Sequence, residues 1–281
     1  VMQKAYKKYF AVFVLPTLLA FTVFFIIPFI MGIVLSFCKF TTVTNARFVG
    51  FSNYIRAFSN ADFINALGFT TKFTIVSVIT INIIAFAIAY GLTRGIKGTN
   101  FFRTTFFMPN LIGGIVLGYI WQLMINAVLA NFDVTITSDA KYGFWGLVIL
   151  MNWQLIGYMM IIYIAAIQNI PGELIEAAKI DGATKTQTMF KVIIPMAMPS
   201  ITICLFLSLT NAFKLFDQNL ALTAGAPSRK TAGLALDIYT TFYNRNGWEG
   251  VGQAKAVVFF IIVGAVSMLQ LYITRKREVE E

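Results

Sequence analysis

The sequence predicts an all-α integral membrane protein with about six transmembrane helices. Of its 281 residues, 58% are hydrophobic and only 12% are charged, about half the charge fraction of a typical soluble domain. Uncharged runs recur that are about as long as the roughly 20 residues needed to cross a bilayer. These runs are continuous rather than alternating, which disfavours a membrane β-barrel.

Six runs of this kind mark the expected helices. They occupy residues 11–38, 73–93, 104–132, 145–167, 195–213 (extending to 222) and 256–274. No polar segment between them exceeds about 30 residues, which is too short for an independent soluble core. We therefore expect residues 1–281 to form a single transmembrane domain.

The first run contains two prolines, Pro16 and Pro28. A proline inside a spanning helix kinks it, and this run is long enough to need a tilt or a bend. Residues 40–67, which follow, are polar and aromatic. They predict an outer loop with a short helix near Asp62.

The third run predicts a break or a close helix contact. Pro109 and Asn110 are followed by Gly113, Gly114 and Gly118. Small residues let helices approach each other in lipid. We favour packing as their role over contact with a substrate.

The fourth run carries polar side chains at membrane depth. Gln154 and Tyr158 are four residues apart and share a helical face. Polar groups within the hydrocarbon seldom face lipid, because an unpaired donor there is costly. We expect this face to look into the bundle or into a wet cavity.

The fifth run contains a stripe at i, i+3, i+4, i+7 spacing. It consists of Ser208, Asn211, Ala212 and Leu215. The stripe either lines a translocation path or packs against other helices, and the spacing alone does not separate these interpretations.

Thr210, Lys214 and Asp217 form a neighbouring stripe on this run. Lys214 and Asp217 are three residues apart, so they can pair on one helix. A structural ion pair near the outer interface is slightly favoured over a lining of the path.

Basic residues predict the orientation. They are densest in the N-terminal segment, in residues 94–103, in residues 169–199 and at the C-terminus. Cytoplasmic segments carry an excess of Lys and Arg, so both termini and the 169–199 loop are expected in the cytoplasm. This distribution accounts for the net charge of +10 without a nucleic-acid partner.

The composition disfavours an enzyme. The chain has no His, which removes the commonest metal ligand and general base. Cys38 and Cys204 lie far apart in apolar runs, so we expect neither a disulfide framework nor a metal site. A phosphate-binding glycine loop followed by Lys and Ser or Thr is missing, so ATP hydrolysis would need a partner. No catalytic residue, metal site or cofactor is expected in this chain.

The 169–199 loop predicts two helices joined by a sharp turn. Pro171 suits the first turn of a helix, Gly182 permits a tight reversal, and Thr184 and Gln187 have the spacing of a capping box. The loop is either an ordinary connector or a docking element for a cytoplasmic protein. Physical reasoning alone favours neither interpretation over the other.

The same loop resembles the EAA loop of permease subunits of binding-protein-dependent ABC importers. The residues that match are Glu176, Ala177, Ala178, Asp181, Gly182, Ala183 and, further on, Pro195. Thr186 departs from the pattern, because sugar permeases often have an aromatic residue there. The segment 222–227 and the six-helix layout resemble the carbohydrate-uptake subfamily, and more its first permease subunit, of the maltose and glycerol-phosphate type, than its second.

The resemblance implies a type I ABC importer permease fold in a bacterial plasma membrane. It also implies a homologous second permease subunit, two cytoplasmic ATPase subunits that bind ATP and Mg²⁺, and an extracellular solute-binding protein that delivers a sugar. The first helix of the EAA loop is expected to dock in a groove of one ATPase. ATP binding would then switch the permease pair between inward and outward access.

The related maltose permease also implies substrate contacts on the fourth and fifth helices. One contact falls on Tyr158, and the others fall on Ser208, Asn211, Ala212 and Leu215, with Gln154 on the same face as Tyr158. Sugar sites combine aromatic faces with hydrogen-bonding groups.

Three alternatives remain at this point. The first is a permease of the same family for glycerol phosphate or another polar solute. The second is an ion-coupled secondary transporter, which is expected to hold buried acids, and only Asp217 comes close. The third, a membrane-embedded enzyme, is disfavoured because no nucleophile stands beside a base.

Overall fold

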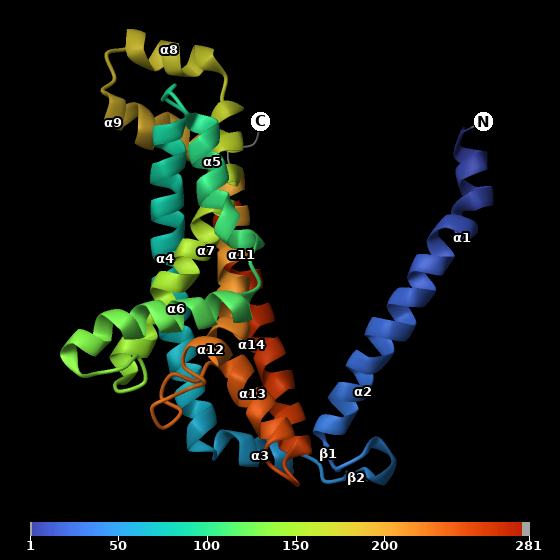
Figure 1. The fold of residues 1–281 in the computed structure, drawn as a ribbon. Coiled ribbons are helices and arrows are strands. Elements are labelled where there is room, and N and C mark those ends of the chain that lie inside the picture. The colour runs from blue at the N-terminus through green and yellow to red at the C-terminus, as the bar shows by residue number, and fades with distance from the viewer. Residues whose placement is uncertain (1, 277–281) are drawn as a thin grey trace. The chain divides into compact units, whose positions relative to one another are not determined.

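The computed structural model describes residues 2–276, which form two compact units (Figure 1). Unit 1 contains the chain up to Asn60 together with Ile238–Phe260, and unit 2 contains Ala61–Asp237 and the chain from Ile261 onward. The expectation that residues 1–281 form a single domain stays a prediction.

Unit 1 begins with a long interrupted helix and a small hairpin. Its elements are α1 (Met2–Phe21), a π-helical turn (Thr22–Ile26), α2 (Ile27–Ser36), β1 (Cys38–Lys39), a 3₁₀ turn (Val43–Asn45), β2 (Arg47–Phe48) and α3 (Ser52–Phe58). β1 and β2 pair antiparallel, with Cys38 opposite Phe48. The buried Asn53 amide donates hydrogen bonds to the carbonyl oxygens of Ser36, at 2.9 Å, and Cys38, at 2.8 Å, which fixes α3 against the hairpin.

The expected irregularity in the first run takes the form of the π-helical turn. It ends at Ile26, two residues before Pro28, which lies in the first turn of α2. Proline has no N–H and its ring crowds the carbonyl four residues earlier, and a widened turn relieves this conflict. Pro16 lies inside α1.

Unit 2 contains most of the helices. Its elements are α4 (Ala61–Leu92), α5 (Thr99–Phe107), a 3₁₀ turn (Met108–Leu111), α6 (Gly114–Leu129), a 3₁₀ turn (Ala130–Phe132), α7 (Ala140–Gln168), α8 (Gly172–Ile180), α9 (Lys185–Thr188), a π-helical turn (Met189–Ile193), α10 (Ile194–Met196), α11 (Met198–Phe213) and α12 (Asp217–Leu222). Two further helices, α13 (Leu234–Tyr243) and α14 (Glu249–Arg275), contribute residues to both units.

The prediction of a short helix near Asp62 was wrong in its position. Asp62 lies in the first turn of α4, where a carboxylate is favoured by the helix dipole, and the short helix of this region is α3. The prediction failed because the polar residues Thr70, Thr71 and Lys72 hide the first turns of α4 from a search for uncharged apolar runs.

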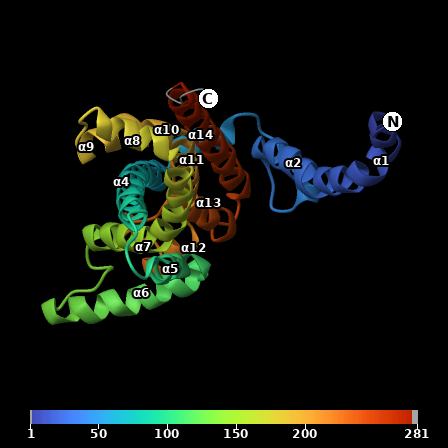
Figure 2. The same cartoon turned by 90° about the horizontal axis from the view of Figure 1, so that it is seen from above.

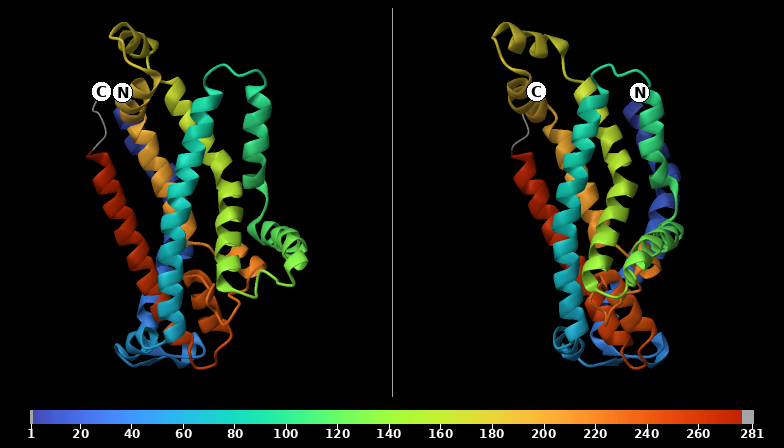
Figure 3. Two further views of the ribbon diagram at one scale, coloured as in Figure 1. Left: turned by 90° about the vertical axis from the view of Figure 1, so that its left-hand side faces the viewer. Right: turned by 60° about the vertical axis from the view of Figure 1, so that its left-hand side comes forward.

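The core of unit 2 is built on α7. It is packed by α4, α5 and α11, and its buried side chains lie on all sides of the helix, as expected for a helix that is apolar all round. Figure 3 shows α4, α5, α7 and α11 running in the same general direction. A Cβ at Gly157 of α7 would overlap the carbonyl group of Phe106, so α5 can approach this closely only because residue 157 is glycine.

The third apolar run is divided, as the sequence predicted. Pro109 lies in the 3₁₀ turn after α5, and α6 then crosses the direction of α4 and α7 (Figure 2). Cβ atoms at Gly114 and Gly118 would come within 2.7 Å of Asp217 Cβ and 2.6 Å of Ala221 Cβ on α12. The expected packing role is therefore confirmed for Gly114 and Gly118, whereas a Cβ at Gly113 would meet no atom within 4 Å.

Apolar helices of membrane-spanning length recur in the described residues. Five meet this test by length and composition, and a sixth is obtained if Lys185–Met196 and Met198–Phe213, bent by 72° to each other, count as one span. This number agrees with the predicted all-α membrane protein with about six transmembrane helices.

Candidate functional site

Helix α8 ends in a Schellman motif at Gly182. The Gly182 N–H donates to the Lys179 carbonyl at 3.1 Å and the Ala183 N–H donates to the Ala178 carbonyl at 2.9 Å. Gly182 has a φ of +76°, a conformation that costs other residues about 1–2 kcal/mol. The predicted glycine turn is therefore present, and its geometry depends on this residue.

Helix α9 begins with the capping box that the sequence predicted. The Thr184 N–H donates to Gln187 Oε1 at 2.7 Å, and the Gln187 N–H donates to Thr184 Oγ1 at 3.2 Å. Two N–H groups at the helix start are thereby satisfied. The Schellman motif and the capping box together fix the reversal between α8 and α9.

The α8–α9 segment lies beyond the ends of α4 and α7 (Figures 1 and 3). Four of the six motif residues are exposed, namely Glu176, Ala177, Asp181 and Gly182, and Ala178 and Ala183 are half-buried. Ile180 is 85% exposed and Leu174 is 41% exposed. Large apolar side chains exposed on a short charged helix are typical of a surface that another protein covers.

A second feature is a polar cavity of about 330 Å³ in unit 2. It lies where α7, the end of α11, the start of α12 and the turn after α5 meet. Its lining residues are Asn110, Met151, Gln154, Leu155, Asn211, Lys214, Phe216, Asp217 and Gln218. The structure therefore brings Gln154 and Asn211, two of the predicted path residues, into one cavity.

Hydrogen bonds organise one wall of this cavity. Gln218 Nε2 donates to Gln154 Oε1 at 2.7 Å, and Gln154 Nε2 donates to the Ile112 carbonyl at 3.4 Å. Asn211 Nδ2 donates to the Leu207 carbonyl of its own helix at 2.8 Å, and the Asn211 side chain is exposed. The wall from Gln154 to Gln218 is thus fixed, and Asn211 presents its amide to the cavity.

Lys214 and Asp217 do not form the expected ion pair in the described part of the chain. α11 ends at Phe213 and α12 begins at Asp217, so the two residues do not lie one turn apart on a common helix. Both are exposed and both line the cavity. The prediction of a structural ion pair was wrong because it assumed that the helix continues through residue 217.

The predicted stripe on α11 is divided between two environments. Asn211 faces the cavity, whereas Ser208, Ala212 and Leu215 are buried within unit 2. These three side chains are buried among helices of the same chain and do not line the cavity. For them, burial favours a role in helix packing over contact with a solute. Tyr158 also lies away from the cavity, half-buried, with its ring centroid 6.5 Å from that of Phe107.

Ser208 takes part in a buried polar network. Asn82 Nδ2 donates to Ser208 Oγ at 2.8 Å, and Tyr163 Oη donates to Asn82 Oδ1 at 2.6 Å. Ser208 Oγ in turn donates to the Cys204 carbonyl at 2.7 Å. The network links α4, α7 and α11, which gives Ser208 a structural role.

Sequence reasoning missed Gln218 and Asn110 as cavity residues. Gln218 directly follows Asp217, the last residue of the second stripe, and Asn110 was assigned to helix packing together with Pro109. One pattern could have identified both as cavity residues, namely an amide side chain next to a helix break. Irregular backbone at membrane depth is tolerated where it is buried in protein or lines a cavity, so polar side chains beside it are expected to face that cavity.

The chemistry of the cavity suits a hydroxylated solute. The amides of Asn110, Gln154, Asn211 and Gln218 offer donors and acceptors, Lys214 offers donors and Asp217 offers acceptors. Within residues 2–276, no group of three or more His, Cys, Asp or Glu side chains could hold a metal ion. The cavity can therefore bind a hydroxylated solute through hydrogen bonds.

Comparisons with known proteins agree with these features. A family model described as "binding-protein-dependent transport system inner membrane component" matches residues 83–279. The chain is 45% identical, over 95% of its length and 94% of the relative's, to the probable starch degradation products transport system permease protein AmyD of Thermoanaerobacterium thermosulfurigenes. It is 32% identical, over 99% of both chains, to the multiple sugar-binding transport system permease protein MsmF of Streptococcus mutans.

A solved structure has the same fold. It is the crystal structure of a bacterial ABC transporter involved in the import of the acidic polysaccharide alginate. The match has a TM-score of 0.82 and 19% sequence identity, and it covers 98% of each chain. At this level of identity the likeness concerns the fold alone.

Proposed function

The chain belongs to the family of binding-protein-dependent transport system inner membrane components, and we propose that it is a permease subunit of an ATP-driven importer for oligosaccharides. The observation that carries the proposal is the exposed α8–α9 segment, with its Schellman motif and capping box, at one end of a bundle of apolar helices. In a multi-pass membrane protein, such a segment allows a conformational change of a bound soluble partner to be transmitted to the transmembrane helices.

An oligosaccharide is the proposed solute for two reasons. The relatives that share 45% and 32% of their residues with this chain are named for starch degradation products and for multiple sugars. The cavity is lined by four amides, one cation and one anion. This balance of charge favours a neutral polyol over an anion such as glycerol phosphate, because an anionic solute would meet Asp217 without a surplus of positive charge.

The proposed coupling surface consists of Glu176, Ala177, Ala178, Asp181, Gly182 and Ala183. Helix α8 docks in a groove of a cytoplasmic ATPase subunit, which binds ATP and Mg²⁺, and Ile180 and Leu174 supply apolar contacts there. A homologous second permease completes the translocation path, and two ATPase subunits and an extracellular solute-binding protein complete the transporter. Residues 1–281 act as a single permease domain.

The proposed location is a bacterial plasma membrane with both termini in the cytoplasm. The density of Lys and Arg at the termini, in residues 94–103 and in the α8–α9 segment supports this orientation. It places the proposed coupling surface on the side where ATP is available.

The test of the solute path is Asn211→Leu in the complete transporter. ATP-driven uptake of labelled maltooligosaccharides into proteoliposomes should fall about 5- to 150-fold, because a lost hydrogen bond to a solute in a site of this kind costs about 1–3 kcal/mol. The matched control is Asn131→Leu, since Asn131, in the 3₁₀ turn after α6, is also exposed and also donates to a local backbone carbonyl, that of Val128 in α6, at 3.2 Å. Unchanged uptake by Asn211→Leu for every saccharide tested would remove Asn211 from the path.

A further inference from the structure

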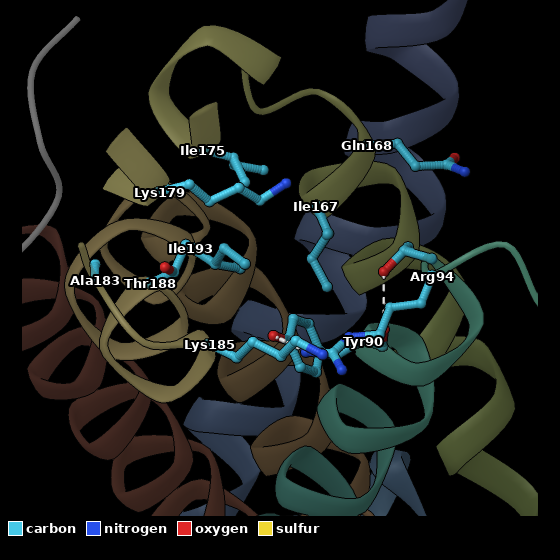
Figure 4. Close-up of a pocket in the computed structure, with 11 residues that line it drawn as sticks. Tyr90, Arg94, Ile167, Gln168, Ile175, Lys179, Ala183, Lys185, Thr188 and Ile193 are labelled. Carbon is cyan, nitrogen blue, oxygen red and sulfur yellow. Dashed lines mark hydrogen bonds between the residues drawn. The ribbon is translucent and has the colours of Figure 1, made fainter. Parts of the chain in front are cut away.

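A second cavity of unit 2 lies beneath the α8–α9 segment. Its volume is about 460 Å³, within the roughly 300–1,000 Å³ of typical ligand pockets. It is enclosed by the ends of α4 and α7 and by the segment from α8 to the following π-helical turn (Figure 4). Its lining residues are Tyr90, Thr93, Arg94, Ile167, Gln168, Ile175, Lys179, Ala183, Lys185, Thr188 and Ile193.

The charges that line this cavity are all positive. Arg94, Lys179 and Lys185 contribute to the lining, and none of the lining residues is acidic. In the described part of the chain no carboxylate forms an ion pair with any of the three. Like charges that share a cavity repel each other, and an anion bound among them removes this repulsion.

The position of Arg94 is fixed by its neighbour. The Arg94 guanidinium lies over the Tyr90 ring, 4.2 Å from its centroid, and donates a hydrogen bond to Tyr90 Oη. In Figure 4 the Lys185 side chain extends towards the same place. A guanidinium held by stacking keeps its remaining N–H groups available, and its planar fork matches the oxygen atoms of a phosphate.

Most of the remaining lining residues are apolar, and Thr93, Gln168 and Thr188 add polar groups. Ile167 and Ile193 are buried, and Ile175 and Tyr90 are half-buried. The cavity lies where two apolar helices end, since α4 ends at Leu92 and α7 at Gln168. Spanning helices end at the level of the lipid headgroups, and basic pockets between such helices bind anionic headgroups.

We propose that this cavity is a binding site for the phosphate of an anionic phospholipid, held by Arg94 and Lys185 with Lys179 at the rim, with the glycerol and upper acyl carbons against the isoleucines. The bound lipid then lies between the helix ends and the back of the proposed coupling surface, which goes beyond the proposed transport function. A soluble phosphate ester shares the anion chemistry but does not use the apolar lining.

The test is native mass spectrometry of the complete transporter with phosphatidylglycerol or phosphatidylcholine. We expect preferential binding of phosphatidylglycerol, and the double variant Arg94→Gln with Lys185→Gln should weaken it about 25-fold, since each basic residue contributes about fivefold. The matched control is Lys97→Gln with Lys191→Gln, two exposed basic residues that do not line the cavity, one in the link after α4 and one in the π-helical turn after α9. Arg94→Lys with Lys185→Arg keeps both charges and should retain binding.

Three outcomes would overturn the proposal. Equal weakening by both double variants would mean that the lipid responds to overall charge and not to the cavity. Displacement of the lipid by glycerol phosphate at equal concentration would assign the site to a soluble phosphate ester. Absence of preferential binding in the complete transporter, although the permease pair without ATPase subunits shows it, would mean that an acidic segment of a partner fills the cavity.

Discussion

At the scale of single residues, Asn82 connects the helices that carry the candidate site. Its amide joins α4 to Ser208 on α11 and to Tyr163 on α7. All three side chains are buried, so each hydrogen bond lost there leaves a polar group without a partner. Polar residues on α11 thus serve two purposes. Ser208 holds α11 against α4, and Asn211 faces the polar cavity.

Replacing Asn82 by Leu should destabilise the protein. We expect the free energy of unfolding to fall by about 1–4 kcal/mol, because interhelical hydrogen bonds in membranes contribute about 0.6–2 kcal/mol each and two are lost. Thermal unfolding of the purified transporter measures this change. Asn211→Leu is the matched control and should leave the melting temperature unchanged, since the Asn211 side chain donates to a carbonyl within α11. Equal destabilisation by both substitutions would show that the network has no special role.

At the scale of elements, the sequence predicted where helices lie along the chain better than how they are oriented relative to one another. The loop at 169–199 was predicted closely, because its turn depends on local geometry at Gly182 and on the capping box at Thr184. The course of α6 could not be predicted, since it depends on contact with α12, about 100 residues further along the chain. The fifth run was bounded at residue 213, where α11 ends, but its polar stripe was continued to Asp217 as if on one helix, because Lys214 and Asp217 have no local feature that stops a helix.

The contact between α6 and α12 should be sensitive to one methyl group. Gly118→Ala would place a Cβ 2.6 Å from Ala221 Cβ and 3.2 Å from the Gln218 carbonyl oxygen. Overpacking of this kind costs about 1–3 kcal/mol, and movement of Gln218 would also disturb the wall of the polar cavity. The expected result is a lower melting temperature together with slower uptake.

Gly91 on α4 provides the control for this substitution. A Cβ there meets no atom within 4 Å, so Gly91→Ala should stabilise its helix by up to about 1 kcal/mol. If Gly118→Ala raised the melting temperature as Gly91→Ala does, the close contact between α6 and α12 would be contradicted.

At the scale of the whole molecule, α11 connects the two candidate sites of unit 2. It follows the α8–α9 segment and α10, and it ends beside Lys214, which lines the polar cavity. Its 16 residues span about 24 Å at 1.5 Å per residue. A movement of the α8–α9 segment can therefore reach the cavity through one packed helix, which is the kind of rigid-body transmission that transporters use.

The candidate site was predictable only in part at this scale. The EAA resemblance pointed to the proposed coupling surface, because its residues all lie between positions 176 and 183 of the sequence. The cavity draws on four separate elements, and Gln154 and Asn211 were found through their polarity in apolar helices. Gln218 could not be found in this way, since its place depends on the turn between α11 and α12.

The most direct test of the account is ATP-driven oligosaccharide uptake by the Gly182→Val transporter in proteoliposomes. Valine at a φ of +76° is strained although no atom lies within 4 Å of the new Cβ, so the turn should rearrange while the helix bundle stays folded. Gly172→Val adds the same side chain to the same loop at an open position without a positive φ. Gly182→Val should lose uptake at least about tenfold, a change of about 1.4 kcal/mol or more, while Gly172→Val should retain it. Full uptake by Gly182→Val would contradict the claim that the α8–α9 segment couples ATP to transport.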